Sequence, residues 1–269
     1  MNPAHEVLTP AEDLPMTTDQ RPVHERIAAD VREDILSGAI PSGVVLRPAD
    51  LSRRFGAAAA SVCQALRLLE GEFLIAPRAE GDVVVRGHRR QTMRPVQGMT
   101  AAGPGEPFPW IAEARRRGVD ACNTLLEVAV LREPPARIAN ALALSAGQPV
   151  VLRHLMLSFD EEPAALIKAY FPYDIAAGTP ITGPGLIRGG IPTLLARRGH
   201  PALRCVDSIS AQVPTQEQYT LLRLPEAVPL LRTFRVVYGT GDRPVFVNDT
   251  VEAAHLYELQ YEFSPAASL

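Results

Sequence analysis

The sequence has little of what marks several common classes of protein. Its 269 residues include only three cysteines, an odd number spaced too far apart for a disulfide framework. No apolar run approaches the roughly 20 residues that a membrane-spanning helix needs, and residues 1–20 are acidic and polar, unlike a signal peptide. An excess of one charge is also missing, because the net charge is −3. We therefore expect a cytoplasmic protein with no membrane partner, in which any nucleic-acid site is a local patch.

Motifs for metal and nucleotide chemistry are absent as well. The six histidines form no H-x-x-x-H, H-E-x-x-H or Cys/His cluster, which argues against a zinc site. No G-x-x-x-x-G-K-S/T loop and no G-x-S-x-G elbow occurs. The glycine-rich residues 178–185 lack the lysine of a phosphate-binding loop, and we expect them to form a loop over a pocket. No metal or cofactor is expected.

What is present divides the chain into a flexible tail (1–20), a first domain (21–88), a linker (89–107) and a second domain (108–265). Apolar residues recur every four positions from Val23 to Ile35, which predicts an amphipathic helix. Two shorter helices are predicted near 49–55 and 58–71, followed by two short strands. Three helices and a hairpin in about 65 residues are typical of a winged helix-turn-helix.

The second domain is predicted to be α+β, with a mostly antiparallel sheet. The turns at 160–163 and 239–242 each separate two strand-like apolar runs, which indicates hairpins. Thr215 with Gln218 three residues later is a capping box that predicts a helix start. The expected strands are 125–131, 150–159, 164–171, 208–213, 230–238, 245–251 and 257–263, and the expected helices are 110–117, 134–144, 191–198 and 215–222.

These stretches resemble two domains of one family of bacterial regulators. The first domain is similar to the DNA-binding domain of the GntR family, through IAADVREDILSG, GVVL, LSRRFG, VCQALRLLE and GDVVV. The second is similar to the UTRA effector-binding domain of the HutC subfamily, through DEEP, ISAQVPTQE, LRLP, PLLRTFRVVY and GDRPV. The resemblance implies a winged helix followed by a chorismate-lyase-like sheet with flanking helices, a homodimer, and operator DNA and a small effector as partners.

The recognition helix departs from the family pattern. The family places a serine and two arginines where this chain has Ala58, Ala59 and Cys63. Each bidentate arginine contact to a base supplies about 1–3 kcal/mol of discrimination, which alanine cannot provide. DNA binding would then rest on other polar side chains of this domain. These candidates are Arg53, Arg54, Ser61, Gln64, Arg67 and Arg78.

The effector site also lacks polar residues that the family pattern contains. Where sugar-phosphate-sensing relatives carry polar ligand residues, this chain has mainly apolar ones, which predicts a small apolar effector held mostly by burial. Arg153 shares strand parity with two of these apolar residues, whereas Lys168 and Tyr170 point to the other face if their strand is regular. The predicted ligand residues are Arg153, Leu155, Leu157, Ile167, Lys168, Tyr170, Ile191, Phe246 and Glu252.

Three functions fit these observations. The first is a ligand-responsive transcription regulator, in which the effector changes the spacing of two winged helices in a dimer. The second is an enzyme derived from such a regulator, a lyase, isomerase or cyclase that uses Glu252 as acid or base and Lys168 to stabilise negative charge. The third is a sensor without DNA affinity that forms mixed dimers with a related regulator.

Overall fold

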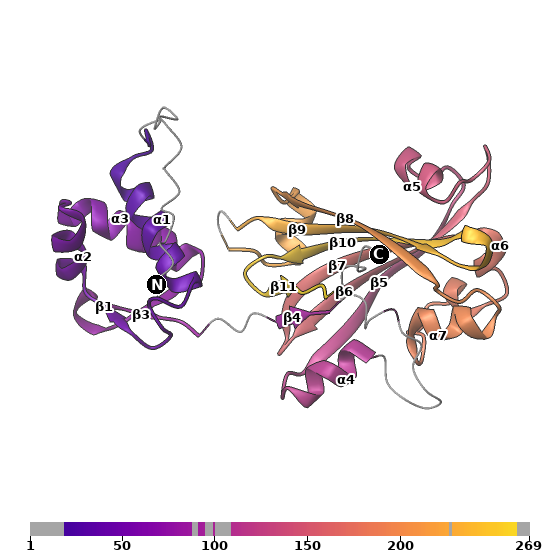
Figure 1. The fold of residues 1–269 in the computed structure, drawn as a ribbon, viewed down its shortest axis with the longest axis horizontal. Coiled ribbons are helices and arrows are strands. Elements are labelled where there is room, and N and C mark those ends of the chain that lie inside the picture. Colours follow the sequence, from indigo (N-terminus) through magenta and orange to yellow (C-terminus); the bar gives the residue numbers. More distant parts are fainter. Residues whose placement is uncertain (1–18, 88–90, 95–98, 100–108, 226–227, 263–269) are drawn as a thin grey trace, which may run out of the picture. The chain divides into compact units, whose positions relative to one another are not determined.

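The chain consists of two units, residues 1–87 and 88–269, each with its own core. Figure 1 shows the fold in a computed structural model, which describes residues 19–87, 91–94, 99, 109–225 and 228–262. Most of the predicted tail and linker therefore lies outside the described residues. In the described part of the chain, no helix is both long and apolar enough to cross a membrane.

Unit 1 is the predicted winged helix-turn-helix. Its helices are α1 (Val23–Leu36), α2 (Pro48–Phe55) and α3 (Ala59–Gly71), and its strands are β1 (Val45–Leu46), β2 (Ile75–Pro77) and β3 (Val83–Val85), paired in the order β1-β3-β2. The stripe of Ile27, Val31 and Ile35 on α1 is buried in one core with Val62 and Leu69 of α3. This burial of one apolar helix face, more than helix propensity, holds α1 and α3 together.

The turn between α2 and α3 depends on a glycine. Gly56 ends α2 in the left-handed region, with a φ of 58° that a side chain with a Cβ rarely adopts. The next helix then starts at Ala59. Gly56 therefore fixes where the turn falls and which residues begin α3.

Unit 2 is built on a six-stranded antiparallel sheet with the strand order β5-β6-β7-β10-β9-β8. Its strands are β5 (Ala121–Leu131), β6 (Val150–Phe159), β7 (Glu162–Pro172), β8 (Arg204–Gln212), β9 (Leu230–Tyr238) and β10 (Pro244–Ala253). Its helices are α4 (Pro109–Arg116), α5 (Ala136–Ala141), α6 (Tyr173–Ala176), α7 (Gly190–Arg197) and α8 (Gln216–Leu221). The capping box predicted at Thr215 is confirmed, because its side chain accepts from the Gln218 amide.

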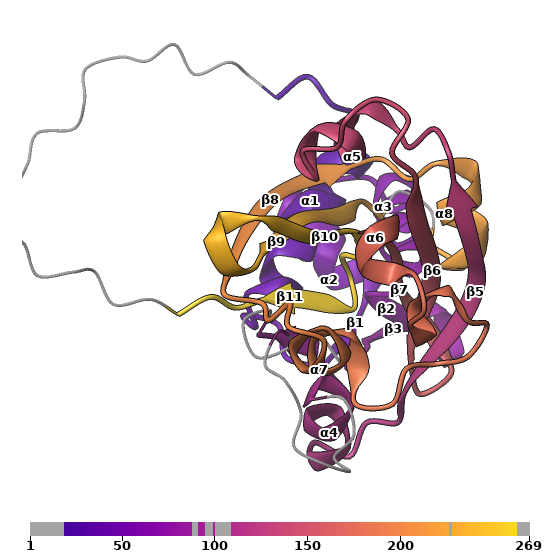
Figure 2. The same ribbon diagram turned by 90° about the vertical axis from the view of Figure 1, so that its right-hand side faces the viewer.

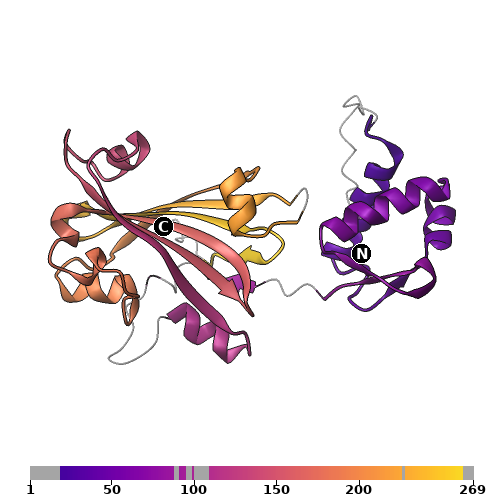
Figure 3. The same ribbon diagram turned by 180° about the vertical axis from the view of Figure 1, so that it is seen from behind.

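Helices cover both faces of this sheet (Figures 2 and 3). One face, which we call the α7 face, packs against Ala114 of α4, Ile175 of α6 and Leu195 of α7 in two apolar clusters. The other, the α8 face, packs against Ile138 of α5 and, just after α8, Leu222. Because strand side chains alternate, each residue of the sheet belongs to one face only.

One short strand was not expected, and its partner lies outside the main sheet. β4 (Gln91–Met93), inside the predicted linker, pairs in parallel with β11 (Tyr257–Leu259). The predicted strand 257–263 thus exists in part but lies in this separate pair instead of the main sheet. Three-residue strands carry too little alternation for a sequence pattern, and their partners are far apart in the chain.

Candidate functional site

The first candidate surface is the exposed side of α3. Ala59, Ala60, Cys63, Gln64 and Arg67 are all exposed, and they recur at the spacing of one helix face. Ser61 is only half-buried, whereas Val62 is fully buried. Ala58 occupies the N-cap position and makes no side-chain hydrogen bond to the first turn. The outward face of α3 is thus mostly small and uncharged.

The arginines predicted to contact DNA differ in their partners. Arg53 pairs with Asp50 on α2, and Arg54 pairs with Asp34 of α1 at 2.7 Å. Within the described residues, Arg67 and Arg78 form no ion pair, and both are exposed. The sequence contained a signal for the first pair, because an acid three residues before an arginine on a helix is a usual salt-bridge spacing.

The second candidate surface is the middle of the α7 face. Leu155 is paired with Ile167 across β6 and β7, and Leu157 lies on the next row, which continues through Ala165 to Glu252 of β10. These four side chains therefore share one face and lie on adjacent rows. Ile191 of α7 and Phe246 pack with Ile167 in one apolar cluster.

Two predicted ligand residues lie elsewhere. Lys168 and Tyr170 are paired with His154 and Leu152, which have the opposite parity to Leu155, so both lie on the α8 face. The Lys168 Nζ is 3.5 Å from Glu217 Oε2 of α8, and Tyr170 is buried in the cluster under α5. The structure therefore separates Lys168 from Glu252, the pair named for the enzyme alternative, by the thickness of the sheet.

Arg153 lies on the α7 face, as its parity predicted. Its hydrogen bonds, however, go to a loop of the same chain. Its side chain is 1% exposed, and its two terminal nitrogens donate to backbone carbonyls of Ile181 at 2.9 Å, Gly183 at 2.8 Å and Gly185 at 2.6 Å. Burial lowers the pKa of this guanidinium. The loop at 178–185 is thus fastened to the sheet, and Arg153 has only Nε without a partner in the described structure.

Replacing Arg153 with leucine should release this loop. The substitution leaves three carbonyls without their donor, and we expect a loss of about 3 kcal/mol or more in the free energy of unfolding of unit 2. The amide protons of 181–185 should exchange with solvent faster. The exposed Arg198 at the end of α7 provides a matched control, because Arg198→Leu removes the same charge without touching the loop. Equal exchange in both variants would contradict this role.

Glu252 is the predicted ligand residue with the most unusual environment. Its side chain is 5% exposed, and Thr233 Oγ1 donates to its Oε2 at 3.5 Å. Burial raises the pKa of Glu252 to about 8, although Thr233 and Arg235 act in the opposite direction. The carboxyl group is therefore mostly protonated at neutral pH, and it can donate one hydrogen bond as well as accept one.

A buried polar network beside Glu252 was missed by the sequence reasoning. Arg235 donates to both carboxylate oxygens of Asp207 at 2.6 Å, and the Tyr261 hydroxyl donates to Asp207 Oδ2 at 2.6 Å. Burial acts to raise the pKa of Asp207, but these hydrogen bonds lower it overall. An arginine at an inward position of the apolar strand β9 was the one available signal, since its partner on β8 is distant in sequence.

One row across the α7 face carries most of the polar groups. It runs from Arg153 through Ala169 and Asn248 to Arg235 and Asp207. Asn248 Oδ1 is buried and, among the described residues, has no hydrogen-bond partner. Ala169, the smallest member, lies between Arg153 and Asn248. The α7 face thus combines apolar rows with a few polar atoms, of which Arg153 Nε, Asn248 Oδ1 and Asn123 Oδ1 have no hydrogen-bond partner among the described residues.

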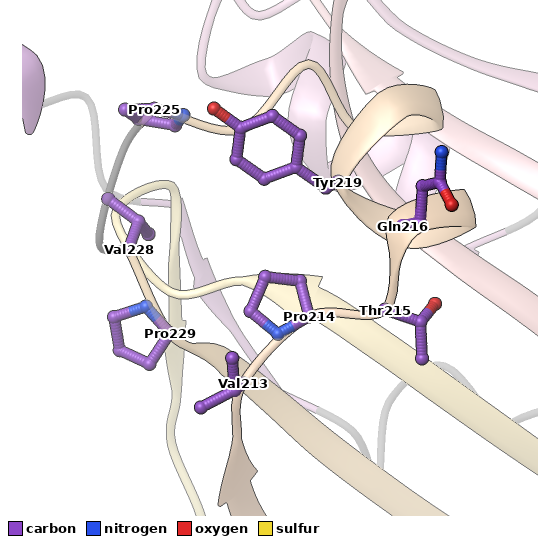
Figure 4. Close-up of a pocket in the computed structure, with 8 residues that line it drawn as sticks. All are labelled: Val213, Pro214, Thr215, Gln216, Tyr219, Pro225, Val228 and Pro229. Atoms are coloured by element: carbon purple, nitrogen blue, oxygen red, sulfur yellow. The ribbon is translucent and has the colours of Figure 1, made fainter.

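Leu157 and Phe246 are core residues. They are 7% and 2% exposed, and they belong to different apolar clusters, which Ile167 joins. Figure 4 shows a pocket of about 430 Å³ at the start of α8, and no predicted ligand residue lines it. Its lining residues are Val213, Pro214, Thr215, Gln216, Tyr219, Pro225, Val228 and Pro229.

Comparison with known families and structures agrees with this two-unit fold. The UTRA domain family matches residues 116–258, more than half of the chain. None of the curated proteins matches the sequence.

Three solved structures share the fold. A crystal structure described as a GntR-family transcriptional regulator has 21% identity and a TM-score of 0.60, over 91% of this chain and 99% of its own. PhnF from Mycobacterium smegmatis has 20% identity and a TM-score of 0.55, over 88% of this chain and 99% of its own. The effector domain of PhnF from the same organism has 18% identity and a TM-score of 0.53, over 65% of this chain and 99% of its own.

Proposed function

The chain belongs to the UTRA-domain family, and from this premise we propose that it is a ligand-responsive transcription regulator of the GntR type, acting in the cytoplasm as a homodimer. One observation carries the proposal: a winged helix with an exposed α3 and a UTRA-type sheet occur in one chain, each with its own core. Similarity to GntR-family structures over about nine tenths of the chain supports the same combination. The motifs of the second unit favour the HutC subfamily.

The α7 face supports a small, neutral and largely apolar effector. Leu155 and Ile167, which are only partly buried, offer no donor or charge to a phosphate. Glu252 is mostly protonated at neutral pH, so it suits a neutral ligand group better than a cation. The unpartnered Oδ1 of Asn248 offers one further acceptor. Binding would favour one spacing of the two winged helices in the dimer and so change operator affinity.

The enzyme alternative has less support. Glu252 keeps the raised pKa that an acid or base needs, but Lys168 lies on the opposite face and cannot assist it. Glu252→Gln still separates the two functions. A sensor should lose only part of its affinity, because one hydrogen bond changes. An enzyme should keep binding and lose about 100- to 10,000-fold in turnover.

Selection of genomic fragments tests the proposal. Purified full-length protein is incubated with fragments of its own genome at physiological salt, and the bound DNA is sequenced. We expect a small set of fragments that share an inverted repeat, as two symmetric winged helices require. Retention of fragments without sequence preference, or of none, would contradict the regulator function and favour the mixed-dimer sensor.

Restoring the two arginines should strengthen non-specific DNA binding. The variant Ala59→Arg/Cys63→Arg places two cations on the exposed side of α3, and each phosphate contacted should steepen the plot of log affinity against log salt by about 0.9. Ala177→Arg/Cys122→Arg is the matched control, because both of its sites are exposed but lie in unit 2. An equal salt dependence in the two variants would show that α3 does not face DNA.

A further inference from the structure

We infer that α3 reads A·T base pairs at the centre of each operator half-site, through methyl and amide groups in place of arginine. This inference rests on the proposed regulator function and adds the base composition of the DNA that it recognises. It concerns the exposed residues of the first two turns of α3, namely Ala59, Ala60, Cys63 and Gln64.

The exposed side of these two turns carries no charge. Three of the four residues end in a methyl or thiol group, and Gln64 is the only one with an amide. The first turn also contains no acidic residue that would repel DNA. The nearest cation along α3 is Arg67, which lies nearly one turn beyond Gln64. The part of a recognition helix that usually meets base edges is therefore neutral here.

The chemistry of these side chains matches A·T pairs. A glutamine amide can accept from adenine N6 and donate to adenine N7 at once, and the methyl of alanine packs on the 5-methyl group of thymine. Guanine offers two acceptors, O6 and N7, and is read best by an arginine or lysine. Neither residue type occurs between Ala59 and Gln64. Along α3, an arginine can read guanine only at the position that faces Arg67.

The arginines of α2 are already paired with acidic residues, so sequence specificity depends more on the base contacts of α3. Arg53 and Arg54 on α2 already pair with Asp50 and Asp34, so part of their charge is neutralised before DNA arrives. The N-terminal amides of α3 receive no side-chain cap from Ala58 and can donate to a phosphate. Backbone contacts of this kind orient the helix but carry no sequence information. Specificity then depends on Gln64 and the alanines.

Selection from a library of random duplexes tests the inference. We expect the full-length protein to enrich inverted repeats with A·T pairs at the centre of each half-site. Enriched repeats with G·C pairs at those positions would overturn the inference and leave the regulator function standing. Failure to enrich any sequence would overturn both.

Base analogues and variants then assign the contacts. Replacing the central thymines of an enriched duplex with deoxyuridine removes their methyl groups and should weaken binding about 4-fold for each methyl buried. Gln64→Ala should reduce the preference for adenine over guanine at one position by about 5- to 150-fold. Gln20→Ala, in the exposed segment before α1, is the matched control and should leave that preference unchanged.

A gain of function completes the test. Ala59→Arg should introduce a preference for guanine at the base pair that Ala59 faces, because an arginine there can donate to O6 and N7. Unchanged affinity for the deoxyuridine duplex, together with unchanged base preference in Gln64→Ala and Ala59→Arg, would overturn the inference even if the protein binds DNA.

Discussion

The stability of unit 2 should fall as the pH rises from 5 to 8, and replacing Glu252 with glutamine should abolish this fall. The pKa of the buried carboxyl is raised to about 8 in the folded chain, against an ordinary value of 4.5. Between these pH values the folded chain keeps a proton that the unfolded chain has released. Stability therefore falls as the pH rises through this window, by about 3 kcal/mol from pH 5 to pH 8.

The variant should lack this slope, because glutamine does not titrate. Other groups also titrate here, and burial lowers the pKa of His154, which gives a slope of the opposite sign. The comparison of wild type with variant cancels such contributions. Urea unfolding followed by fluorescence suits the measurement, since the single tryptophan and all six tyrosines lie in unit 2. Glu258→Gln, at an exposed site, is the control. Equal slopes in wild type and Glu252→Gln would show that Glu252 is ionised.

Replacing Leu157 with aspartate should unfold unit 2 and leave unit 1 folded. Leu157 is 7% exposed and packs with Ala114 of α4 and Val119. A carboxylate at this site loses the apolar contacts and buries an unpaired charge, so we expect a loss of about 4 kcal/mol or more. Unit 1 should be unaffected, because its core contains no residue of unit 2.

Two optical signals separate the units in this experiment. Fluorescence of tyrosine and tryptophan reports on unit 2 alone, whereas far-ultraviolet circular dichroism reports on the helices of both units, of which α1, α2 and α3 belong to unit 1. We expect the fluorescence to change at low urea, together with the helical signal of unit 2, and the helical signal of unit 1 to persist. Leu203→Asp, at a site 65% exposed, should change neither. Loss of the entire helical signal at the urea concentration where the fluorescence of Leu157→Asp changes would show that the units do not fold independently.

Local patterns predicted the fold well. The apolar stripe of α1, Gly56 at the end of α2 and the capping box at Thr215 are each determined within a few residues. The strand predicted at 230–238 is β9. Strand parity likewise placed Leu155 and Leu157 on one face and Lys168 and Tyr170 on the other. Such features need only neighbouring residues, which is why one sequence suffices to find them.

Local sequence patterns did not predict the side-chain contacts that define the site. Parity placed Arg153 on the correct face but did not show that loop carbonyls already occupy its terminal nitrogens. The network of Arg235, Asp207 and Tyr261 joins three segments that only the folded sheet brings together. The core packing of Leu157 depends on α4, whose position no local pattern gives. Side-chain partners distant in sequence therefore remained unpredicted.

Sequence-specific binding to an operator is tested most directly by the affinity of the full-length protein for a selected duplex and for its scrambled counterpart. Both titrations are made at physiological salt, because phosphate contacts alone bind any sequence at low salt. A regulator should bind the selected duplex at least about 1,000-fold more tightly than the scrambled one. Equal affinity for the two duplexes would contradict the function as a sequence-specific regulator.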